Sequence, residues 1–557
     1  MLLALNIVLL SSPAWFAQWN GPASFLIATA LLLLTNIALV AWWERTTPSS
    51  GEPSSSRPIS VPLLGAILLL SIAARDWLHQ ILIFPLDSQR ADMLVVVQAG
   101  IHRLLQGKNP YAMYNVPWPA TLPYGPVMWA PLILPALAHA DIRLATLVGA
   151  LFTPCLCVLV AGEEWAGGRR LAAAAWLGLM AALTFSPDLR NFMPIGHTPG
   201  YWPLLALLAW FVARERWNAA AIVSGLLVVA RTTMIALAPV ILIAVWYRDR
   251  PRFWRTAALL VAAFALPYLP FAIWDWSALK YGLYGSYQVI VKGYVWASTD
   301  WAQHTIGTTG TLLAHGWGRA VEAIQALVMI AVYAAAAFAI RAGRRPLPWL
   351  VFALLAFSMT TLWPVTYIYL DVALLGIGAA AAEISWARPR EGLRPLLAAL
   401  ALAAVTAGLT IWGDVPADAS IDVGRPPARD YLYAGFSGDE RQDEITYSWI
   451  NGTRAEILVP RRSRANATID IVCQPHLPTR AAVQQLSASL NGTVLGTVTL
   501  KDGWQHIELK APGHAWQIGV NELTLFLSSA VSPKELGLSD DQRKLSMAVD
   551  RLTVRTP

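Results

Sequence analysis

Residues 218–247 read NAAAIVSGLLVVARTTMIALAPVILIAVWY, two apolar segments separated by one arginine and two threonines. Each segment falls short of the roughly 20 residues that an α-helix needs to cross a bilayer. Arg231 is therefore carried at membrane depth or at a membrane surface, where an arginine is costly unless it meets an anion. The stretch predicts a membrane protein with short or broken helices. It leaves two partners open for Arg231, a lipid phosphate or a structural ion pair.

The composition agrees with this prediction. Of the 557 residues, 56% are hydrophobic and 13% are charged, a balance that soluble globular proteins do not carry. Residues 1–412 hold 26 Lys and Arg against 17 Asp and Glu, whereas residues 413–557 hold 15 against 17. A bilayer-embedded body is thus followed by a water-soluble tail. The net charge of +7 lies in loops between apolar segments, where the positive-inside rule explains it without a nucleic-acid partner.

Several site chemistries are excluded by the residues present. Two of the three cysteines lie inside an apolar run and the third is alone in the tail, so a disulfide framework or a zinc quartet cannot form. Walker A and HExxH motifs are also absent.

The apolar segments predict 13 transmembrane helices, near 1–16, 23–43, 61–80, 143–162, 171–186, 201–213, 218–230, 233–247, 256–272, 318–340, 348–364, 367–386 and 395–412. Arginine clusters at 169–170, 214–216, 248–255, 341–345 and 388–394 alternate with Arg-poor loops, which places these clusters in the cytoplasm. The N-terminus is then inside and the C-terminus outside. A cleaved signal peptide is the alternative for the first segment, although it lacks a basic start.

The predicted organisation has four parts. They are a transmembrane hairpin (1–44), a cytoplasmic Ser/Pro-rich linker (45–60), a helical membrane domain (61–412) with outer loops 81–140 and 273–317, and an extracytoplasmic β-sandwich (413–557). Most of the 23 tryptophans of residues 1–412 lie near predicted helix ends. This is typical of an interfacial aromatic belt, and sugar stacking is the alternative.

The tail has the pattern of a β-sandwich. Alternating apolar residues at 486–490 and 494–498 flank Asn491-Gly492, which predicts a hairpin, and further strands are expected at 507–509 and 523–527. Sequons begin at Asn451, Asn466 and Asn491, but we favour turns over glycosylation there because Asn-Gly is a hairpin signal.

The outer loop 81–140 is the most informative region for function. It carries Asp87 and Asp92, then an amphipathic stretch, then Gly107-Lys108-Asn109-Pro110-Tyr111. Later it carries Pro123-Tyr124-Gly125-Pro126, which leads into an apolar stretch (127–139) that is too short and Pro-broken to span a bilayer. We expect both stretches to lie along the membrane interface.

In the order and spacing of these motifs, residues 61–412 resemble the polyprenol-phosphate-dependent glycosyltransferases of the GT-C superfamily, nearest to glycosyltransferase family 87. Met193-Pro194-Ile195-Gly196-His197 is similar to the family's Gly-Gln turn, with His197 in place of Gln. Ala230-Arg231-Thr232-Thr233 is similar to its basic residue between two short helices. The segment 363–369 is similar to the family's Pro-x-Ser-Trp-x-His, but Tyr369 stands where His is expected.

The resemblance implies transfer of a mannose-like or arabinose-like sugar from a polyprenyl-phosphate donor to an acceptor hydroxyl on the outer face of the plasma (inner) membrane, with inversion. Asp92 is the implied general base, with Asp87 as the runner-up; the alternative is that Asp92 only caps a helix. The implied cations that hold the donor phosphate are Arg231, Lys108, Lys280 and Lys292. The implied substrate contacts are the aromatic and histidine side chains Tyr111, Tyr124, His197, His304 and Tyr369.

No essential metal or other cofactor is expected, because Asp87 and Asp92 are not part of a DxD motif. The expected partners are the lipid-linked donor, a glycan or glycolipid acceptor and the bilayer.

Two other classes of function stay open. A transporter or flippase of lipid-linked sugar also uses interrupted helices, and a non-enzymatic protein would use the tail to bind glycan. The tail resembles galactose-binding-like jelly rolls, which implies an accessory domain for the acceptor; a structural cap is the alternative.

Overall fold

The computed structural model describes residues 61–83, 86, 91–115, 119–184, 187–296, 307–362, 368–383, 416–425, 428, 431–479 and 481–557. The predicted hairpin 1–44, the linker 45–60 and the apolar segment 395–412 lie outside these residues. The chain divides into two compact units, one of Met1–Trp77, Leu86–Ala136 and Ile142–Ala404 and one of Leu78–Pro85, Leu137–Asp141 and Val405–Pro557.

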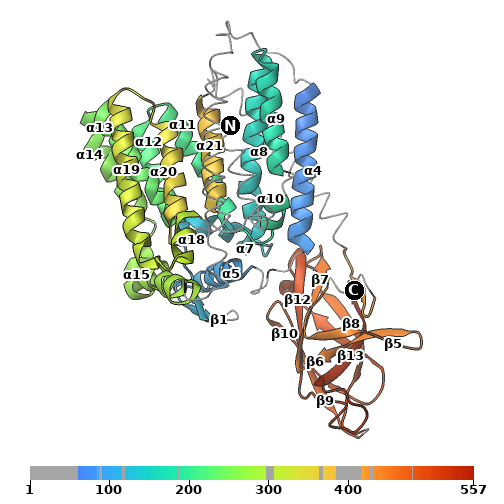
Figure 1. Ribbon diagram of the computed structural model, residues 1–557. Coiled ribbons are helices and arrows are strands. Elements are labelled where there is room, and N and C mark those ends of the chain that lie inside the picture. Colours follow the sequence, from blue (N-terminus) through green and yellow to red (C-terminus); the bar gives the residue numbers. More distant parts are fainter. Residues whose placement is uncertain are drawn as a thin grey trace. The chain divides into compact units, whose positions relative to one another are not determined.

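The first unit is helical (Figure 1), and its packed helix pairs include neighbours in sequence as well as helices far apart in the chain. Pairs such as α8 with α9, α12 with α14, and α11 with α21 pack along their lengths. Its main helices are α4 (Val61–Ile83), α5 (Asp92–Leu105), α8 (Arg143–Ala166), α9 (Arg170–Thr184), α10 (Pro187–Phe192), α11 (Trp202–Ala213), α12 (Trp217–Ala230), α13 (Leu237–Arg248), α14 (Phe253–Ala265), α15 (Leu269–Lys280), α16 (Ser286–Ile290), α18 (Gly307–Ala314), α19 (Val321–Arg341), α20 (Leu347–Thr360) and α21 (Ile368–Glu383).

The helices are shorter than 13 full spans would require. Within the described residues, two helices are long and apolar enough to cross a membrane, Arg143–Trp165 and Gly318–Arg341. A third span is obtained if Arg250–Ala265 and Leu269–Gly293, which meet at 61°, count as one. The predicted count of 13 is not confirmed, whereas the expectation of short or broken helices is met by eight apolar helices of 10–17 residues. These apolar helices indicate membrane residence.

The stretch 127–139 belongs to a series of short pieces. They are α6 (Pro126–Trp129), the 3₁₀ turn η1 (Ala130–Leu132) and α7 (Ile133–Leu137). Pro131 lies in the 3₁₀ turn between α6 and α7, where it interrupts the helix because proline cannot donate the helical backbone hydrogen bond. A short hairpin of β1 (Met113–Asn115) and β2 (Pro119–Thr121) precedes them.

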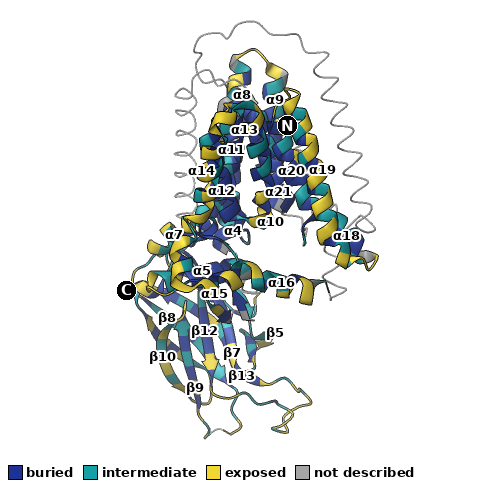
Figure 2. Ribbon diagram, turned by 90° about the vertical axis from the view of Figure 1, so that its left-hand side faces the viewer, coloured by how far each residue is buried: buried dark blue, intermediate teal, exposed yellow. Residues whose placement is uncertain are grey.

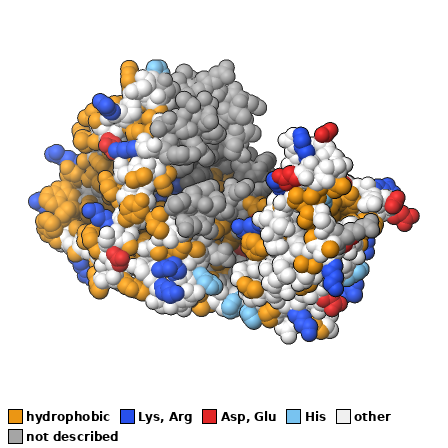
Figure 3. All heavy atoms as spheres, turned by 90° about the horizontal axis from the view of Figure 1, so that it is seen from below, with side chains coloured by type: hydrophobic (Ala, Val, Ile, Leu, Met, Phe, Trp, Pro, Cys, Tyr) orange, Lys and Arg blue, Asp and Glu red, His pale blue; other side chains and the backbone are white. Residues whose placement is uncertain are grey.

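The burial pattern of the helices suits a membrane environment. Helices α20 and α21 are mostly buried, whereas α14 and α19 each expose one side (Figure 2). The exposed side of α19 is apolar, with Phe338 79% and Leu327 67% exposed. Other large hydrophobic side chains of this unit are also exposed, among them Trp254 and Ile273, and hydrophobic side chains lie among charged ones on the face that Figure 3 shows. Apolar surface on this scale is expected where lipid, and not water, surrounds a protein.

The second unit contains two antiparallel sheets with one apolar core between them. Their orders are β10-β9-β12-β7-β4 and β11-β8-β13-β6-β5, and β3 pairs with β13. The strands are β3 (Ser420–Asp422), β4 (Leu432–Ala434), β5 (Phe436–Gln442), β6 (Ile445–Asn451), β7 (Arg454–Arg461), β8 (Ala467–Pro475), β9 (Gln484–Leu490), β10 (Thr493–Leu500), β11 (Gln505–Ala511), β12 (Gly519–Leu527) and β13 (Leu545–Arg555).

The local predictions for this sandwich are confirmed. Strands β9 and β10 form the expected hairpin, with Leu490 opposite Thr493. Asn491 and Gly492 have φ angles of 48° and 80°, the left-handed pair that a type I′ turn requires. The strands expected near 507–509 and 523–527 are β11 and β12, and their apolar residues alternate into the core.

Close backbone approach joins α11 to α21. A Cβ atom built on Gly378 of α21 would lie 2.8 Å from the Cα of Ala206 in α11, closer than real Cβ contacts come. Small residues allow helices in a membrane to approach closely and pack well. Gly378 thereby fixes the distance between α21 and the start of α11, where the candidate site lies.

Replacement of Gly378 by alanine tests this packing. We expect Gly378→Ala to destabilise the purified protein by about 1–3 kcal/mol, because backbone would have to move to admit the methyl group. Gly178→Ala is the matched control, since Gly178 is also inside a helix but a methyl group added there would meet no atom within 4 Å. That change should be neutral or stabilising by up to about 1 kcal/mol. Equal unfolding temperatures for the two variants in neutral detergent would contradict the proposed contact.

Candidate functional site

Arg231 lies where the backbone leaves one helix and enters the next. Helix α12 ends at Ala230, Arg231 is extended with φ −151° and ψ 127°, and the 3₁₀ turn η3 (Thr232–Ala236) follows. The guanidinium is largely buried, with 10% of the side chain exposed. Its anionic partner within the chain is Asp371 of α21, which is the structural ion pair that the sequence left open beside a lipid phosphate.

Asp371 is enclosed by three donors. Its Oδ2 lies 3.1 Å from Nη1 of Arg231 and accepts a hydrogen bond of 2.8 Å from the Tyr201 hydroxyl. Its Oδ1 accepts a bond of 3.1 Å from the Trp202 indole N–H. Arg231 Nη1 also lies 3.3 Å from the Tyr201 hydroxyl. Only 1% of the Asp371 side chain is exposed, so these bonds replace the water that the carboxylate loses on burial.

The sequence reasoning did not identify Asp371, Tyr201 or Trp202. One signal was available for Asp371, because it is an acidic residue inside the predicted apolar segment 367–386. An ionisable residue at membrane depth is a functional or pairing candidate by default. Tyr201 and Trp202 gave no such signal, since aromatic residues at a helix start are also typical of an interfacial belt.

A ring pair lies beside this ion pair. Tyr124 from the predicted Pro-Tyr-Gly-Pro turn stacks on His197, with ring centroids 4.6 Å apart and planes inclined by 30°. His197 is in the loop between α10 and the 3₁₀ turn η2 (Thr198–Tyr201), and it is buried. Burial, and then the positive charge of Arg231, lower the pKa of His197 to about 3. The imidazole is therefore neutral at physiological pH and offers a hydrogen bond, not a positive charge.

The turn that carries Tyr124 is held close to Arg231. A Cβ atom on Gly125 would collide with the carbonyl oxygen of Val229, two residues before Arg231. The Tyr268 hydroxyl donates to the same carbonyl at 3.3 Å. The structure thus brings Tyr124, His197 and Arg231 together, three predicted residues from distant parts of the sequence.

Tyr111 stabilises the turn that carries Tyr124. Its hydroxyl donates to the carbonyl oxygen of Tyr124 at 2.9 Å, and its ring meets the ring of Phe271 edge to face at 5.5 Å. The Trp129 indole N–H donates to the same carbonyl at 3.2 Å. The resemblance implied a substrate contact for Tyr111, but its side chain is buried and packs in the turn.

Helix α5 contributes Leu94, Val97 and Ile101 to a buried apolar cluster, against which Tyr124 and Ile195 pack. The amphipathic spacing also predicted Leu104 and Leu105 on this face, but Leu104 is only partly buried and Leu105 is exposed. The predicted general base, Asp92, is the first residue of this helix, but its side chain lies outside the described residues. Asp87, the runner-up, and His304 also lie outside them.

The three predicted lysines have other surroundings. Lys108 is exposed in the turn after α5, and Lys280 is exposed at the end of α15. Lys292 pairs with Glu322 at 2.6 Å and lies 6.0 Å from the ring centre of Trp296. Tyr369 is buried in α21, two residues before Asp371. Among the described residues, no group of three or more His, Cys, Asp or Glu side chains could hold a metal ion.

The tail carries a second candidate surface, the tail aromatic face, made of Tyr447, Trp449 and Trp504. The Tyr447 ring lies 5.9 Å from Trp449 and 5.7 Å from Trp504, and all three side chains are partly exposed. Tyr447 and Trp449 alternate with the buried residues Ser448 and Ile450 of β6, so they point away from the core. Trp516 differs, because it is buried under the Arg461 guanidinium, 4.5 Å from its ring centre.

Comparison with known proteins gives weak similarities. No family model matches the chain, and no curated protein matches its sequence. Among solved structures, the arabinosyltransferase EmbB from Mycobacterium smegmatis is similar with a TM-score of 0.26 and 13% identity, over 96% of this chain and 69% of EmbB.

Two carbohydrate-binding modules are similar to a quarter of the chain. The C-terminal family 6 module of the marine laminarinase LamC from Zobellia galactanivorans has a TM-score of 0.17 and 14% identity, over 25% of this chain and 99% of the module. A family 35 module from Clostridium thermocellum has a TM-score of 0.19 and 12% identity, over 26% and 100%. At such identities and TM-scores, these similarities identify neither a family nor an activity.

A double-mutant cycle tests the buried pair. We expect Asp371→Asn and Arg231→Gln each to destabilise the protein by about 3 kcal/mol, because each leaves an uncompensated charge in apolar surroundings. The double variant should cost less than the sum of the two by about 1–3 kcal/mol. Denaturant unfolding of the four proteins in the same mild detergent measures this coupling, and strict additivity would show that the two side chains do not interact.

Proposed function

We propose that this protein is a membrane glycosyltransferase that transfers a sugar from a polyprenyl-phosphate donor to an acceptor hydroxyl at the outer face of the membrane. The observation that carries the proposal is the meeting of Arg231 and Asp371 with Tyr124 and His197. The buried guanidinium of Arg231, whose orientation is fixed by Asp371, lies beside the stacked rings of Tyr124 and His197. Such a cluster supplies the elements for an anionic sugar donor, namely one positive charge, one neutral hydrogen-bonding group and one aromatic face.

The charge of Arg231 is only partly cancelled by its partner. Asp371 also accepts hydrogen bonds from Tyr201 and Trp202, so its negative charge is shared among three donors. A donor phosphate beside Arg231 would exchange hydration for a charge-assisted hydrogen bond, which is stronger in apolar surroundings of low dielectric than in water. Asp371 acts as a positioning residue in this proposal, because it fixes the guanidinium and does not touch the substrate.

The reaction needs one base and no general acid. As the acceptor oxygen attacks the anomeric carbon, Asp92 takes its proton, and the bond between that carbon and the phosphate oxygen breaks. The bonding electrons leave with the polyprenyl phosphate, which is already a weak base, and the anomeric configuration inverts. Arg231 holds the developing phosphate charge, and neutral His197 donates or accepts a hydrogen bond without adding charge.

Replacement of the base tests the enzyme proposal. In proteoliposomes with a panel of polyprenyl-phosphate sugars, Asp92→Asn should lower turnover by about a hundredfold or more, because it removes a proton acceptor and preserves shape. Asp249→Asn is the matched control, since Asp249 pairs with Arg252 in the turn after α13. If Asp92→Asn keeps wild-type activity and Asp87→Asn loses it, the base is Asp87. If no donor is used by the wild type, the enzyme proposal is wrong.

The tail aromatic face suits an accessory role in acceptor binding. Flat, partly exposed aromatic rings are a common lining of small-molecule and sugar sites, and the face has no catalytic pair of its own. We propose that Trp449 and Trp504 contact the glycan acceptor. The same rings would have no effect on transfer if the tail were only a structural cap.

Two tryptophan replacements separate these roles. Trp449→Ala with Trp504→Ala should raise the KM for a native glycan acceptor by about tenfold, and leave the KM for a small soluble acceptor unchanged. Phe526→Ala is the control, because Phe526 is an exposed aromatic residue on the other sheet, stacked with Arg454. Equal effects on both acceptors, or an equal effect of the control, would assign a stabilising role to the tail. Deletion of residues 430–557 gives the same comparison for the whole domain.

A further inference from the structure

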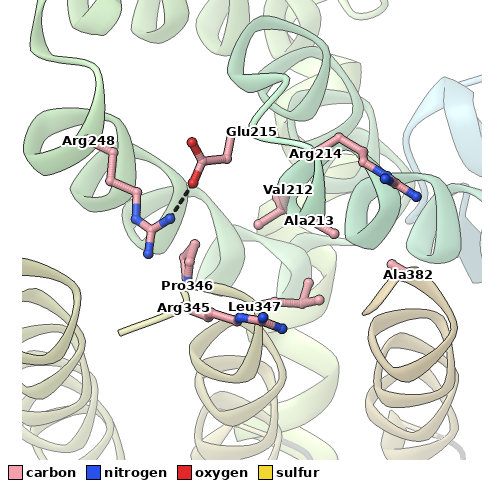
Figure 4. A pocket seen from close by; sticks show the side chains of 9 residues that line it. All are labelled: Val212, Ala213, Arg214, Glu215, Arg248, Arg345, Pro346, Leu347 and Ala382. Carbon is pink, nitrogen blue, oxygen red and sulfur yellow. Dashed lines mark hydrogen bonds and ion pairs between the residues drawn. The ribbon is translucent and has the colours of Figure 1, made fainter. Parts of the chain in front are cut away.

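A basic pocket lies where the ends of four helices of the first unit meet. It has a volume of about 250 Å³ and is formed by the ends of α11, α13 and α21 and the beginning of α20 (Figure 4). Its polar lining consists of Arg214, Glu215, Arg248 and Arg345, and the remaining lining residues are apolar apart from their backbones. This pocket shares no residue with the candidate site around Arg231.

The walls of the basic pocket are fixed by the chain itself. Arg248 pairs with Glu215, as the dashed line in Figure 4 marks, and donates to the carbonyl oxygen of Arg344 at 3.0 Å. These bonds join the turn after α11 to the turn before α20. Both turns contain a residue in the left-handed region, Glu215 with φ 52° and Gly343 with φ 84°. The pocket is therefore preformed, and a ligand would not have to order it.

Among the described residues that line the basic pocket, positive side chains outnumber negative ones. Its lining has three arginines and one glutamate, and the glutamate pairs with Arg248. Arg214 follows the last residue of α11, where a cation compensates the negative helix end. Arg345 precedes α20 by two residues, at the positive end of that helix, where a cation is unfavourable by the same argument. The positive end of α20 and the arginine side chains of the lining both favour an anion in the pocket.

The apolar part of the lining indicates the source of such an anion. Leu347, Val212 and Ala382 are buried residues at the ends of apolar helices. Basic pockets between the ends of membrane helices are typical sites for anionic lipid headgroups. We propose that the basic pocket binds a phosphate group, carried by an anionic phospholipid headgroup or free in solution.

Lipid titration of the full-length protein tests the proposal. Native mass spectrometry in neutral detergent would compare phosphatidylglycerol with zwitterionic phosphatidylcholine. The variant Arg214→Gln with Arg345→Gln should weaken phosphatidylglycerol binding by about tenfold or more, because two charge-assisted hydrogen bonds are lost. Arg341→Gln with Arg344→Gln is the matched control, since it removes the same charge from residues that do not line the pocket. We expect it to change binding by less than about twofold, because these two side chains do not line the pocket and would act on a bound anion only over a longer, screened distance.

The outcomes are distinct. Competition by inorganic phosphate would assign the pocket to free phosphate, and lipid binding without such competition would assign it to the headgroup. The variant Arg214→Lys with Arg345→Lys keeps the charge, so retained binding there shows that loss in the glutamine variant is not misfolding. Equal binding by the wild type and the glutamine variant overturns the proposal. An equal loss in the control also overturns it, because the net charge of the loops would then explain binding.

Discussion

The ion pair between Arg231 and Asp371 is the constraint on which the first unit depends. It joins the break between α12 and η3 to α21, and the hydroxyl and indole donors of Tyr201 and Trp202 add the start of α11. Each of these groups loses water on burial, and burial of any one of them without its partners would destabilise the fold. The pair has all of its hydrogen-bond partners only when these three elements are correctly placed relative to one another. Its main effect is therefore to select one arrangement of the helices, and its net contribution to the free energy of folding is smaller.

Irregular backbone around the pair has the same origin. Arg231 is extended between two short helices, an arrangement that lipid would not tolerate but that a protein interior does. Glycines then permit the close approach of backbones, Gly378 between α21 and α11 and Gly125 between the turn that carries Tyr124 and the carbonyl of Val229. Short, broken helices are therefore what a buried polar cluster requires, and they explain why few of the described helices of this unit reach the full length of a membrane span.

How much the sequence predicted depends on how local each signal is. The sandwich strands were predictable, because alternation and the Asn491-Gly492 turn act over a few residues. The need of Arg231 for an anion was also predictable from its apolar surroundings, but the identity of that anion was not. Asp371 lies 140 residues further along the chain, and no periodic pattern relates the two positions. Pairing at that distance is a property of helix packing, which apolar segments alone do not determine.

The cluster of Arg231, Asp371 and His197 has no net charge, and this affects how it could bind the proposed donor. His197 is uncharged, and Arg231 and Asp371 together carry no net charge, so the resting cluster attracts a donor only weakly from a distance. A phosphate that has arrived meets a guanidinium whose counter-charge is spread over three hydrogen bonds, in surroundings where water screens little. The exposed lysines Lys108 and Lys280 have the opposite properties, because solvent screens them at close range. In the proposed enzyme the lysines would therefore raise the rate at which the anionic donor binds. Arg231 would stabilise the negative charge that develops on the phosphate as the sugar leaves it.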